Sequence, residues 1–206
     1  KKISSILKKY SPVCIFNIAA ETHVDRSIDS PKNFVLSNIL GVFNLLESFR
    51  EHYKKNKRTK LIHVSTDEVY GSISKKGNFT ESSPYAPNSP YSASKASADM
   101  LVRSYVNTYK FPAITTNCSN NFGPYQHSEK FIPKIVRNAI KDTEIPIYGD
   151  GQNVRDWLYV GDHVTMLFLL MFSETKYRHY SIGGGTKLSN KNLLDLILKY
   201  MADKKF

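Results

Sequence analysis

Hydrophobic positions along the chain follow two different periods. Apolar residues recur at spacings of three and four over residues 3–10, 31–49, 91–109, 130–140, 162–172 and 190–201, a pattern that predicts amphipathic helices. Short apolar runs at residues 13–19, 61–65, 113–118, 145–148 and 180–182 predict buried strands. Pro12 and Pro112 follow predicted helices and Pro31 opens one. Residues 71–90, rich in Gly, Ser, Asn and Pro, predict a surface loop.

Strand and helix take turns along the whole chain. This alternation predicts an α/β fold, in which right-handed crossovers build a doubly wound, mostly parallel sheet. Ligands are then expected at the carboxyl ends of the strands.

Composition and charge narrow the classes of function. The chain has 29 Lys and Arg against 18 Asp and Glu, a formal net charge of +11, which would suit an anionic partner. The densest basic run, at residues 54–60, lies between a predicted helix and a predicted strand. No helix-turn-helix, zinc knuckle or aromatic stacking motif accompanies it, so we expect a solvated connection and no nucleic-acid partner. A basic nucleic-acid-binding module remains a distant alternative, which steeply salt-dependent binding to unrelated oligonucleotides would indicate.

No apolar stretch reaches ~18 residues and no signal peptide opens the chain. We therefore expect a cytoplasmic protein with no membrane partner. Cys14 and Cys118 each lie in a predicted strand, where a small buried hydrophobe is expected rather than a disulfide or a metal ligand.

Tyr91 and Lys95 are candidate catalytic residues. Four residues apart on a predicted helix, they share one face, so that the ammonium can favour the phenolate and make the phenol a general base. The same spacing recurs in two Lys-rich stretches, where solvated helix faces are expected: Tyr53 with Lys57 and Tyr200 with Lys204. Only context distinguishes Tyr91, since it follows a strand and a Pro-rich loop.

Two acidic residues, Asp67 and Glu68, follow the strand predicted at 61–65. Adjacent carboxyl groups at the carboxyl end of a strand can serve as acid and base toward a bound reactant. In the alternative interpretation, Asp67 caps a turn and Glu68 is solvated.

Five segments together resemble one family of enzymes. They are AAETHVDRSI at 19–28, STDEVYG at 65–71, YSASK at 91–95, TNCSNNFGPYQ at 116–126 and RDWLYVGDH at 155–163. In this order they resemble the dTDP-glucose 4,6-dehydratases of the extended short-chain dehydrogenase group, and the resemblance covers nearly the whole chain. The Thr-Asp-Glu triplet is its most specific element, because related epimerases and decarboxylases keep the Tyr and Lys but lack the acidic pair.

The resemblance implies an NAD-dependent lyase that oxidises carbon 4 of the glucose, eliminates water across carbons 5 and 6, and returns the hydride to carbon 6. Tyr91 would be the base for the carbon-4 hydroxyl, while Lys95 would hold the nicotinamide ribose and lower the pKa of Tyr91. Thr66 would hydrogen-bond the same hydroxyl. Glu68 would remove the carbon-5 proton, and Asp67 would protonate the departing hydroxyl.

The resemblance also implies binding residues, a fold and an assembly. The residues expected to line NAD, besides Tyr91 and Lys95, are Ala19, Ala20, Ser37 and Asn121. Those expected to line the nucleotide sugar, besides Thr66, are Thr22, Asn120, Lys130, Phe131, Pro146, Ile147, Tyr148, Arg155 and Asn190. Residues 1–125 would form a partial Rossmann-like NAD-binding domain, and residues 126–206 a mixed region that binds substrate and returns strands to the main sheet. The full-length enzyme is expected to be a homodimer.

Alternatives remain for some of these residues. A guanidinium matches phosphate oxygens, but Arg155 could instead pair with Asp156. The two asparagines at 120 and 121 could serve turn chemistry before Gly123. His23 and Asp25 have no partner cluster, so no metal site is expected.

The chain departs from the family pattern in two places. The Gly-rich turn between the first strand and helix, which meets a dinucleotide pyrophosphate, is expected before Lys1, and a final part of the substrate domain after Phe206. The glycines at 183–185 predict an ordinary turn, and Ser181 stands where the family has Asn. The chain is therefore either a fragment of a longer dehydratase, an inactive truncated remnant, or part of another NAD-dependent nucleotide-sugar epimerase or dehydratase. Thymine and uracil remain open as the base.

Overall fold

The computed structural model describes residues 2–72, 77–147, 149–174 and 178–204, which fold into two units. Unit 1 comprises Lys1–Cys118 and Leu167–Ile182, and unit 2 comprises Ser119–Met166 and Gly183–Phe206. The expected domain boundary at residues 125/126 concerns a whole enzyme and stays a prediction.

Unit 1 is built on a sheet of four parallel strands. Its order is β1 (Cys14–Asn17), β2 (Lys60–Thr66), β3 (Ala113–Cys118) and β6 (His179–Ile182). The register places Asn17 beside His63 and Thr66 beside Cys118, so the carboxyl ends of β1, β2 and β3 meet at one edge. The predicted parallel α/β sheet is confirmed.

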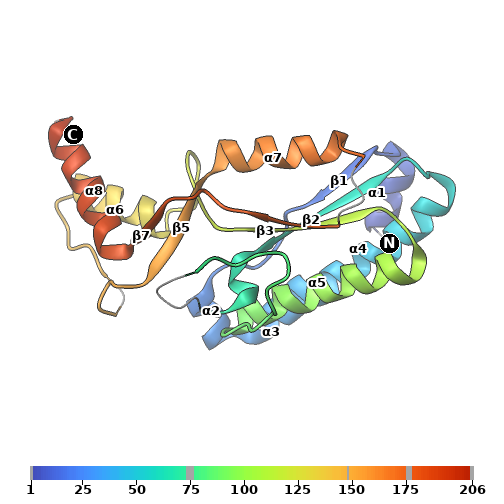
Figure 1. Cartoon of the computed structure of the whole chain (residues 1–206), viewed down its shortest axis with the longest axis horizontal. Coiled ribbons are helices and arrows are strands. Elements are labelled where there is room, and N and C mark those ends of the chain that lie inside the picture. The colour runs from blue at the N-terminus through green and yellow to red at the C-terminus, as the bar shows by residue number, and fades with distance from the viewer. Residues whose placement is uncertain (1, 73–76, 148, 175–177, 205–206) are drawn as a thin grey trace. The chain divides into compact units, whose positions relative to one another are not determined.

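Helices α4 (Gly41–Lys55) and α5 (Pro90–Tyr109) lie side by side on one face of this sheet (Figure 1). Phe49 of α4 and Phe111 meet edge to face, with ring centroids 4.9 Å apart. The buried core between helices and strands also contains Val42, Leu46, Leu61, Ala98, Val102 and Ala113. On the opposite face lies the end of α7 (Val160–Phe172), where Phe168 stacks on Phe16 of β1.

The sequence explains where α5 begins and ends. Ser89 caps its first turn in a reciprocal pair with Ser92, and Pro90 occupies the first helical position. At the other end, Lys110 adopts a left-handed conformation with φ 57°, and Pro112 follows. These signals hold Tyr91 in the first turn of a 20-residue helix.

The helix predicted for residues 31–49 has three parts. It begins as α3 (Pro31–Phe34), continues through a π-helical stretch η1 (Val35–Leu40), and ends as α4. Around it lie the shorter helices α1 (Lys2–Tyr10) and α2 (Val24–Asp29). One turn of 3₁₀-helix, η2 (Asp67–Tyr70), follows β2. The described residues of the predicted loop at 71–90 form neither helix nor strand before Pro90.

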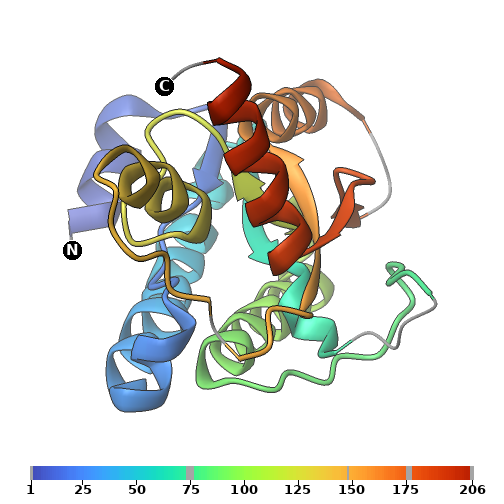
Figure 2. The same cartoon turned by 90° about the vertical axis from the view of Figure 1, so that its left-hand side faces the viewer.

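The described part of unit 2 contains a sheet of three short strands, the helices α6 and α8, and the beginning of α7. β4 (Asn120–Phe122) pairs in parallel with β5 (Val154–Tyr159), which pairs antiparallel with β7 (Lys187–Ser189). Helices α6 (Phe131–Ile140) and α8 (Asn190–Asp203) lie side by side, as Figure 2 shows. At the glycine turn, a Cβ on Gly184 would come 2.0 Å from the Trp157 carbonyl oxygen, so only glycine fits this close approach.

Two of the expectations for unit 2 need correction. Residues 145–147 form no strand, because Pro146 lacks the N–H that a ladder needs; Tyr148 lies outside the described residues. The strands of unit 2 were not predicted: β4 and β7 are too short to show a period, and β5, although six residues long, carries charged residues and is mostly not buried, so it forms no apolar run. Of the cysteines, Cys118 is buried as expected and Cys14 is half-buried, and the two form no disulfide. No helix in the described ranges is long and apolar enough to cross a membrane.

Candidate active site

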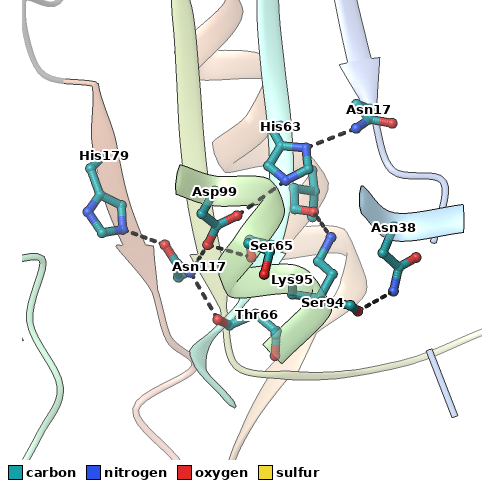
Figure 3. Close-up of polar contacts among 12 residues, drawn as sticks. Asn17, Asn38, His63, Ser65, Thr66, Ser94, Lys95, Asp99, Asn117 and His179 are labelled. Atoms are coloured by element: carbon teal, nitrogen blue, oxygen red, sulfur yellow. Dashed lines mark hydrogen bonds and ion pairs between the residues drawn. The ribbon is translucent and has the colours of Figure 1, made fainter. Parts of the chain in front are cut away.

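Thr66 connects the predicted catalytic residues at the carboxyl end of β2. Its hydroxyl accepts a hydrogen bond from the backbone N–H of Glu68 at 3.3 Å and donates to Asp67 Oδ1 at 3.4 Å. The same side chain hydrogen-bonds the phenol of Tyr91. From β3, Asn117 Nδ2 donates to the Thr66 carbonyl at 2.9 Å (Figure 3). One buried hydroxyl therefore bonds the Asp67 carboxylate and the Glu68 backbone N–H beside the Tyr91 phenol.

Tyr91 and Lys95 lie one turn apart on α5, facing the end of β2. Tyr91 is 8% exposed and Lys95 is 4% exposed. The ammonium of Lys95 donates one hydrogen bond, of 2.7 Å, to the carbonyl of Val64. Because an ammonium has three N–H groups, this bond leaves donors for another partner.

The electrostatics of Tyr91 differ from the expectation. Burial raises the pKa of the Tyr91 phenol well above its ordinary value, and the nearby charge of Glu68 raises it further; the hydrogen bond to Thr66 opposes both. The sequence predicted that Lys95 would lower this pKa. The net direction is opposite, because the phenol is buried beside a carboxylate while the ammonium is bonded to Val64.

A buried polar network behind Lys95 was not predicted. Asp99, one turn further along α5, is 4% exposed and accepts hydrogen bonds from Ser65 Oγ at 2.8 Å and Asn117 Nδ2 at 3.2 Å (Figure 3). Its other carboxylate oxygen lies 3.2 Å from Nε2 of the fully buried His63. The sequence held one signal for it: a charged residue that continues the four-residue spacing of Tyr91 and Lys95 along one helix face.

Asn38 in η1 holds the segment that follows β1. Its Oδ1 accepts from the Glu21 N–H at 2.8 Å, and its Nδ2 donates to the Glu21 carbonyl at 3.0 Å and to Ser94 Oγ at 2.9 Å. This buried amide ties residues near 21 to α5. The π-helical stretch places Asn38 inward while its neighbour Ser37 is exposed.

The expected binding residues divide between the two units. Unit 1 holds Ala19, Ala20, Thr22 and Ser37, of which only Ala20 is half-buried and the others are exposed. Unit 2 holds Asn120, Asn121, Lys130, Phe131, Pro146, Ile147, Arg155 and Asn190. Tyr148 lies outside the described residues.

Contacts within unit 2 bear on the alternatives for two of these residues. Asp156 accepts from the backbone N–H groups of Gly184 at 2.8 Å and Thr186 at 2.7 Å, and it forms no ion pair with Arg155 in the described part of the chain. Asn121 donates to the Ser119 carbonyl at 3.0 Å, and its Oδ1 lies 2.8 Å from Nδ1 of His163. Burial lowers the pKa of His163, which therefore meets Asn121 as a neutral donor.

Nowhere among the residues that the structure covers do three or more His, Cys, Asp or Glu side chains gather as metal ligands would. Carboxylates, a phenol and an ammonium are instead the titratable groups at the end of β2.

Comparison with known proteins places the chain in a family. The family described as GDP-mannose 4,6 dehydratase matches residues 1–205. The chain belongs to this family. It is 44% identical over 200 residues to a dTDP-glucose 4,6-dehydratase of Xanthomonas campestris pv. campestris (strain B100), covering 95% of this chain and 57% of the relative. A dTDP-glucose 4,6-dehydratase of Haemophilus influenzae is 44% identical, with 98% of this chain and 61% of the relative covered.

Solved structures of GDP-mannose 4,6-dehydratase family relatives agree with the fold. The dTDP-glucose 4,6-dehydratase DesIV of Streptomyces venezuelae, with NAD and TYD bound, is 41% identical with a TM-score of 0.91, covering 98% of this chain and 60% of that chain. A UDP-glucose 4-epimerase of Thermotoga maritima, with UDP-glucose, is 27% identical with a TM-score of 0.87, covering 96% of this chain and 64% of that chain. The resemblance and the Rossmann-like fold class predicted from sequence are confirmed. The chain spans about three fifths of the length of the curated relatives it matches.

Proposed function

We propose that this chain carries the catalytic centre of an NAD-dependent dTDP-glucose 4,6-dehydratase. The observation that carries the proposal is the arrangement around Thr66, whose hydroxyl bonds the Asp67 carboxylate and the Glu68 backbone N–H beside the Tyr91 phenol, with the Glu68 charge acting on that phenol. Oxidation of a sugar hydroxyl needs a base that takes the hydroxyl proton. Elimination of water from the neighbouring carbons needs a second base, which removes a proton from carbon, and an acid, which protonates the leaving hydroxyl. These groups lie together at the end of β2.

The residues present fit NAD. Lys95 keeps donors for ribose hydroxyls beyond its bond to Val64, and Ala19 and Ala20 follow β1 with side chains small enough for a cofactor to approach the backbone. NAD, when bound, supplies the hydride acceptor and donor and a positive charge that favours a phenolate. The raised pKa of Tyr91 in the chain alone makes that charge necessary.

In the first step, Tyr91 would take the proton of the carbon-4 hydroxyl while Thr66 holds the oxygen. The new ketone acidifies the carbon-5 proton, which Glu68 would remove. Asp67 would protonate the carbon-6 hydroxyl as it leaves as water. When the hydride returns to carbon 6, protonated Glu68 would give its proton back to carbon 5. The cycle closes when Tyr91 releases the proton of the carbon-4 hydroxyl and Asp67 takes up one proton in place of the one that left with the water.

The remaining parts of the proposal concern substrate, assembly and location. The nucleotide diphosphate would be bound by residues of unit 2: Arg155, Lys130 and Asn190, with Phe131, Pro146, Ile147 and Tyr148 around it. Asn120 and Thr22 would contact the sugar. Ser37 and Asn121 would contact the cofactor. Exposed apolar side chains on η1, α4 and α5 support a homodimer: Leu36 at 47%, Leu40 at 46%, Phe43 at 40% and Met100 at 45%. The cytoplasm as its location stays part of the proposal.

Interactions in the basic run support an enzyme rather than a nucleic-acid-binding module. Lys54 pairs with Glu51 at 2.7 Å, and Lys57 lies 4.6 Å from the centre of the Tyr53 ring. Lys60 donates to the carbonyls of Met171 at 3.0 Å and Ser173 at 2.5 Å. Cations already used in this way are poorly placed to follow a phosphate backbone.

The test is a hybrid enzyme, in which this chain replaces the 200 aligned residues of the Xanthomonas campestris relative. In it, Glu68→Gln should separate oxidation from elimination. The amide cannot take a proton, so loss of a deuterium placed at carbon 5 should slow by roughly a hundred- to ten-thousandfold. Hydride transfer should persist because Tyr91 and Lys95 are unchanged, so that reduced cofactor accumulates, seen by its absorbance in a single turnover.

Two controls make the result specific. Asp67→Asn should act at the same stage but less severely, because water can partly protonate a leaving hydroxyl. Glu144→Gln makes the same change at an exposed carboxylate of unit 2 and should be silent. If Glu68→Gln abolishes the formation of reduced cofactor altogether, the assignment of Glu68 as the carbon-5 base is wrong. A product epimerised at carbon 4, with carbon 6 intact, would favour the epimerase alternative instead.

A further inference from the structure

Asp99 is a buried carboxylate that the proposed reaction does not use. It follows Tyr91 and Lys95 at the same four-residue spacing on α5, so it lies one helical turn beyond Lys95. At 4% exposed it is as buried as Lys95. Because burying a charge without partners costs several kcal/mol, a carboxylate in this position needs an explanation.

All partners of the Asp99 carboxylate are donors. Oδ2 accepts from Ser65 Oγ at 2.8 Å, Tyr85 Oη at 3.0 Å and Asn117 Nδ2 at 3.2 Å. These donors come from β2, from the loop before α5 and from β3. They fasten α5 to the ends of the two strands that carry Thr66 and its partner Asn117.

His63 faces the other oxygen of Asp99 as a neutral ring. Asn17 Nδ2 lies 2.9 Å from Nδ1 of His63 and donates to it, so the ring proton is on Nε2, which is 3.2 Å from Asp99 Oδ1. Burial lowers the pKa of His63, and the charge of Lys95 lowers it too, while the contact with Asp99 acts in the opposite direction. His63 therefore adds no charge beside Asp99, and its Nε2 and the Asp99 Oδ1 approach each other without a well-formed hydrogen bond.

Lys95, one helical turn before Asp99 on α5, is the buried cation on which the Asp99 charge acts; no direct ion pair joins the two in the described part of the chain. The other titratable groups around Asp99 are Tyr85, Tyr70 on η2 and His179 on β6. Burial raises the pKa of both phenols and lowers that of His179, so all three are neutral near pH 7. Burial also lowers the pKa of Lys95, and the negative charge of Asp99 is the strongest influence that raises it.

We propose that Asp99 is a positioning residue for Lys95: its buried negative charge keeps the ammonium charged, and its bonds to β2 and β3 hold α5 so that Tyr91 and Lys95 face Thr66. The role rests on the proposed function, in which a charged Lys95 binds the ribose and favours the phenolate of Tyr91. Without Asp99, burial acts on Lys95 nearly unopposed. A neutral amine neither attracts a phenolate nor donates as strongly to a ribose.

The first experiment follows Lys95 in the 206-residue chain without substrate or cofactor. Carbon-13 at Cε of lysine reports the titration by NMR, and Lys95→Met identifies the resonance by removing it. Asp99→Asn keeps the shape and removes the charge, so the Lys95 midpoint should move to lower pH. Tyr85→Phe is the matched control, because it removes one hydrogen bond to Asp99 and leaves the charge; the midpoint should stay. An unchanged midpoint in Asp99→Asn overturns the proposal.

If Asp99→Asn does not fold, the unsubstituted chain still decides. Two charges that interact titrate as a pair, so the Asp99 Cγ resonance should move at the pH at which Lys95 loses its proton. A Cγ resonance that stays still through the Lys95 titration overturns the proposal.

The second experiment measures oxidation at carbon 4 by the hybrid enzyme across pH. Asp99→Asn should slow the formation of reduced cofactor by on the order of tenfold or more near pH 8. The defect should shrink as the pH is lowered and Lys95 regains its proton. The alkaline limb of the pH profile should move to lower pH, and the KM for the sugar should be nearly unchanged. An equal loss at every pH would mean that Asp99 only supports the fold.

The two proposals fail in different ways. If the hybrid enzyme does not oxidise the sugar but the titration midpoint of Lys95 depends on Asp99, the proposed function is refuted and the positioning role is supported. If the hybrid enzyme is active but the titration midpoint of Lys95 is the same in Asp99→Asn as in the unsubstituted chain, only the positioning role is refuted.

Discussion

Gly71 should not tolerate a side chain, for a reason that the structure makes quantitative. It follows η2, which carries Asp67 and Glu68, and has φ 86° and ψ −148°, a region open almost only to glycine. A Cβ there would come 2.3 Å from the carbonyl oxygen of Ala86. The obstacle is backbone and not a flexible side chain, so Gly71→Ala must either move Ala86 or break the conformation.

The expected cost has two parts. Holding alanine in this backbone region costs about 1–3 kcal/mol. Displacing Ala86 weakens the 2.9 Å hydrogen bond from its N–H to the carbonyl of buried Val69, worth about 1 kcal/mol or more when the groups are left unpaired. We therefore expect Gly71→Ala to lower the free energy of unfolding by about 3 kcal/mol, against a typical total of about 5–15 kcal/mol.

Urea unfolding followed by circular dichroism measures this difference on the 206-residue chain. Gly77→Ala is the matched control in the same loop, since its φ of 140° is also positive but a Cβ there meets nothing within 4 Å. It should cost about 1–2 kcal/mol. If the two variants unfold at the same urea concentration, the close approach between Gly71 and Ala86 does not determine the stability of this turn, and the reasoning is refuted.

Two further predictions concern single ionisable side chains. In the hybrid enzyme, Tyr91→Phe should slow oxidation at carbon 4 by on the order of a hundredfold or more, whereas Tyr53→Phe and Tyr200→Phe should be silent; an equal loss in either control would show that the Tyr–Lys spacing does not identify the base. Burial holds the pKa of His63 below its usual value of 6.5, so below that pH the unfolded chain binds a proton that the folded chain does not. The free energy of unfolding should therefore fall as the pH drops, by up to about 1.4 kcal/mol at pH 5.5 from His63 alone. Urea midpoints at pH 7.5 and 5.5 check this, and a drop of equal size in His63→Gln would contradict it.

The sequence predicted the framework of unit 1 because its signals there are local. The helix at α5 has a capping serine, a proline at its first position and another after its end, and apolar residues in one stripe. The strands β2 and β3 are long enough, with seven and six residues, to show as apolar runs. Where elements are short the prediction was incomplete, since the three-residue strands β4 and β7 carry no readable period.

The candidate catalytic residues could be named from sequence, but their arrangement could not. Thr66, Asp67, Glu68, Tyr91 and Lys95 stand in two short motifs, and the sequence alone predicted a role for each. The tertiary structure decided the contacts among them: the Thr66 hydroxyl bonds the Asp67 carboxylate and the Glu68 backbone N–H beside the Tyr91 phenol. The roles themselves stay predictions.

The sequence by itself determined the order of helices and strands, the family and the identity of the candidate residues, because each depends on short-range pattern. Only the tertiary structure decided the state of the site. Asp99, His63 and Asn117 are brought together by the register of β2 on β3 and the packing of α5, through contacts that join residues 36 and 18 positions apart and follow no period. The direction of the Tyr91 pKa was wrong from sequence for the same reason, since the burial and the Glu68 charge that raise it arise only when the chain has folded.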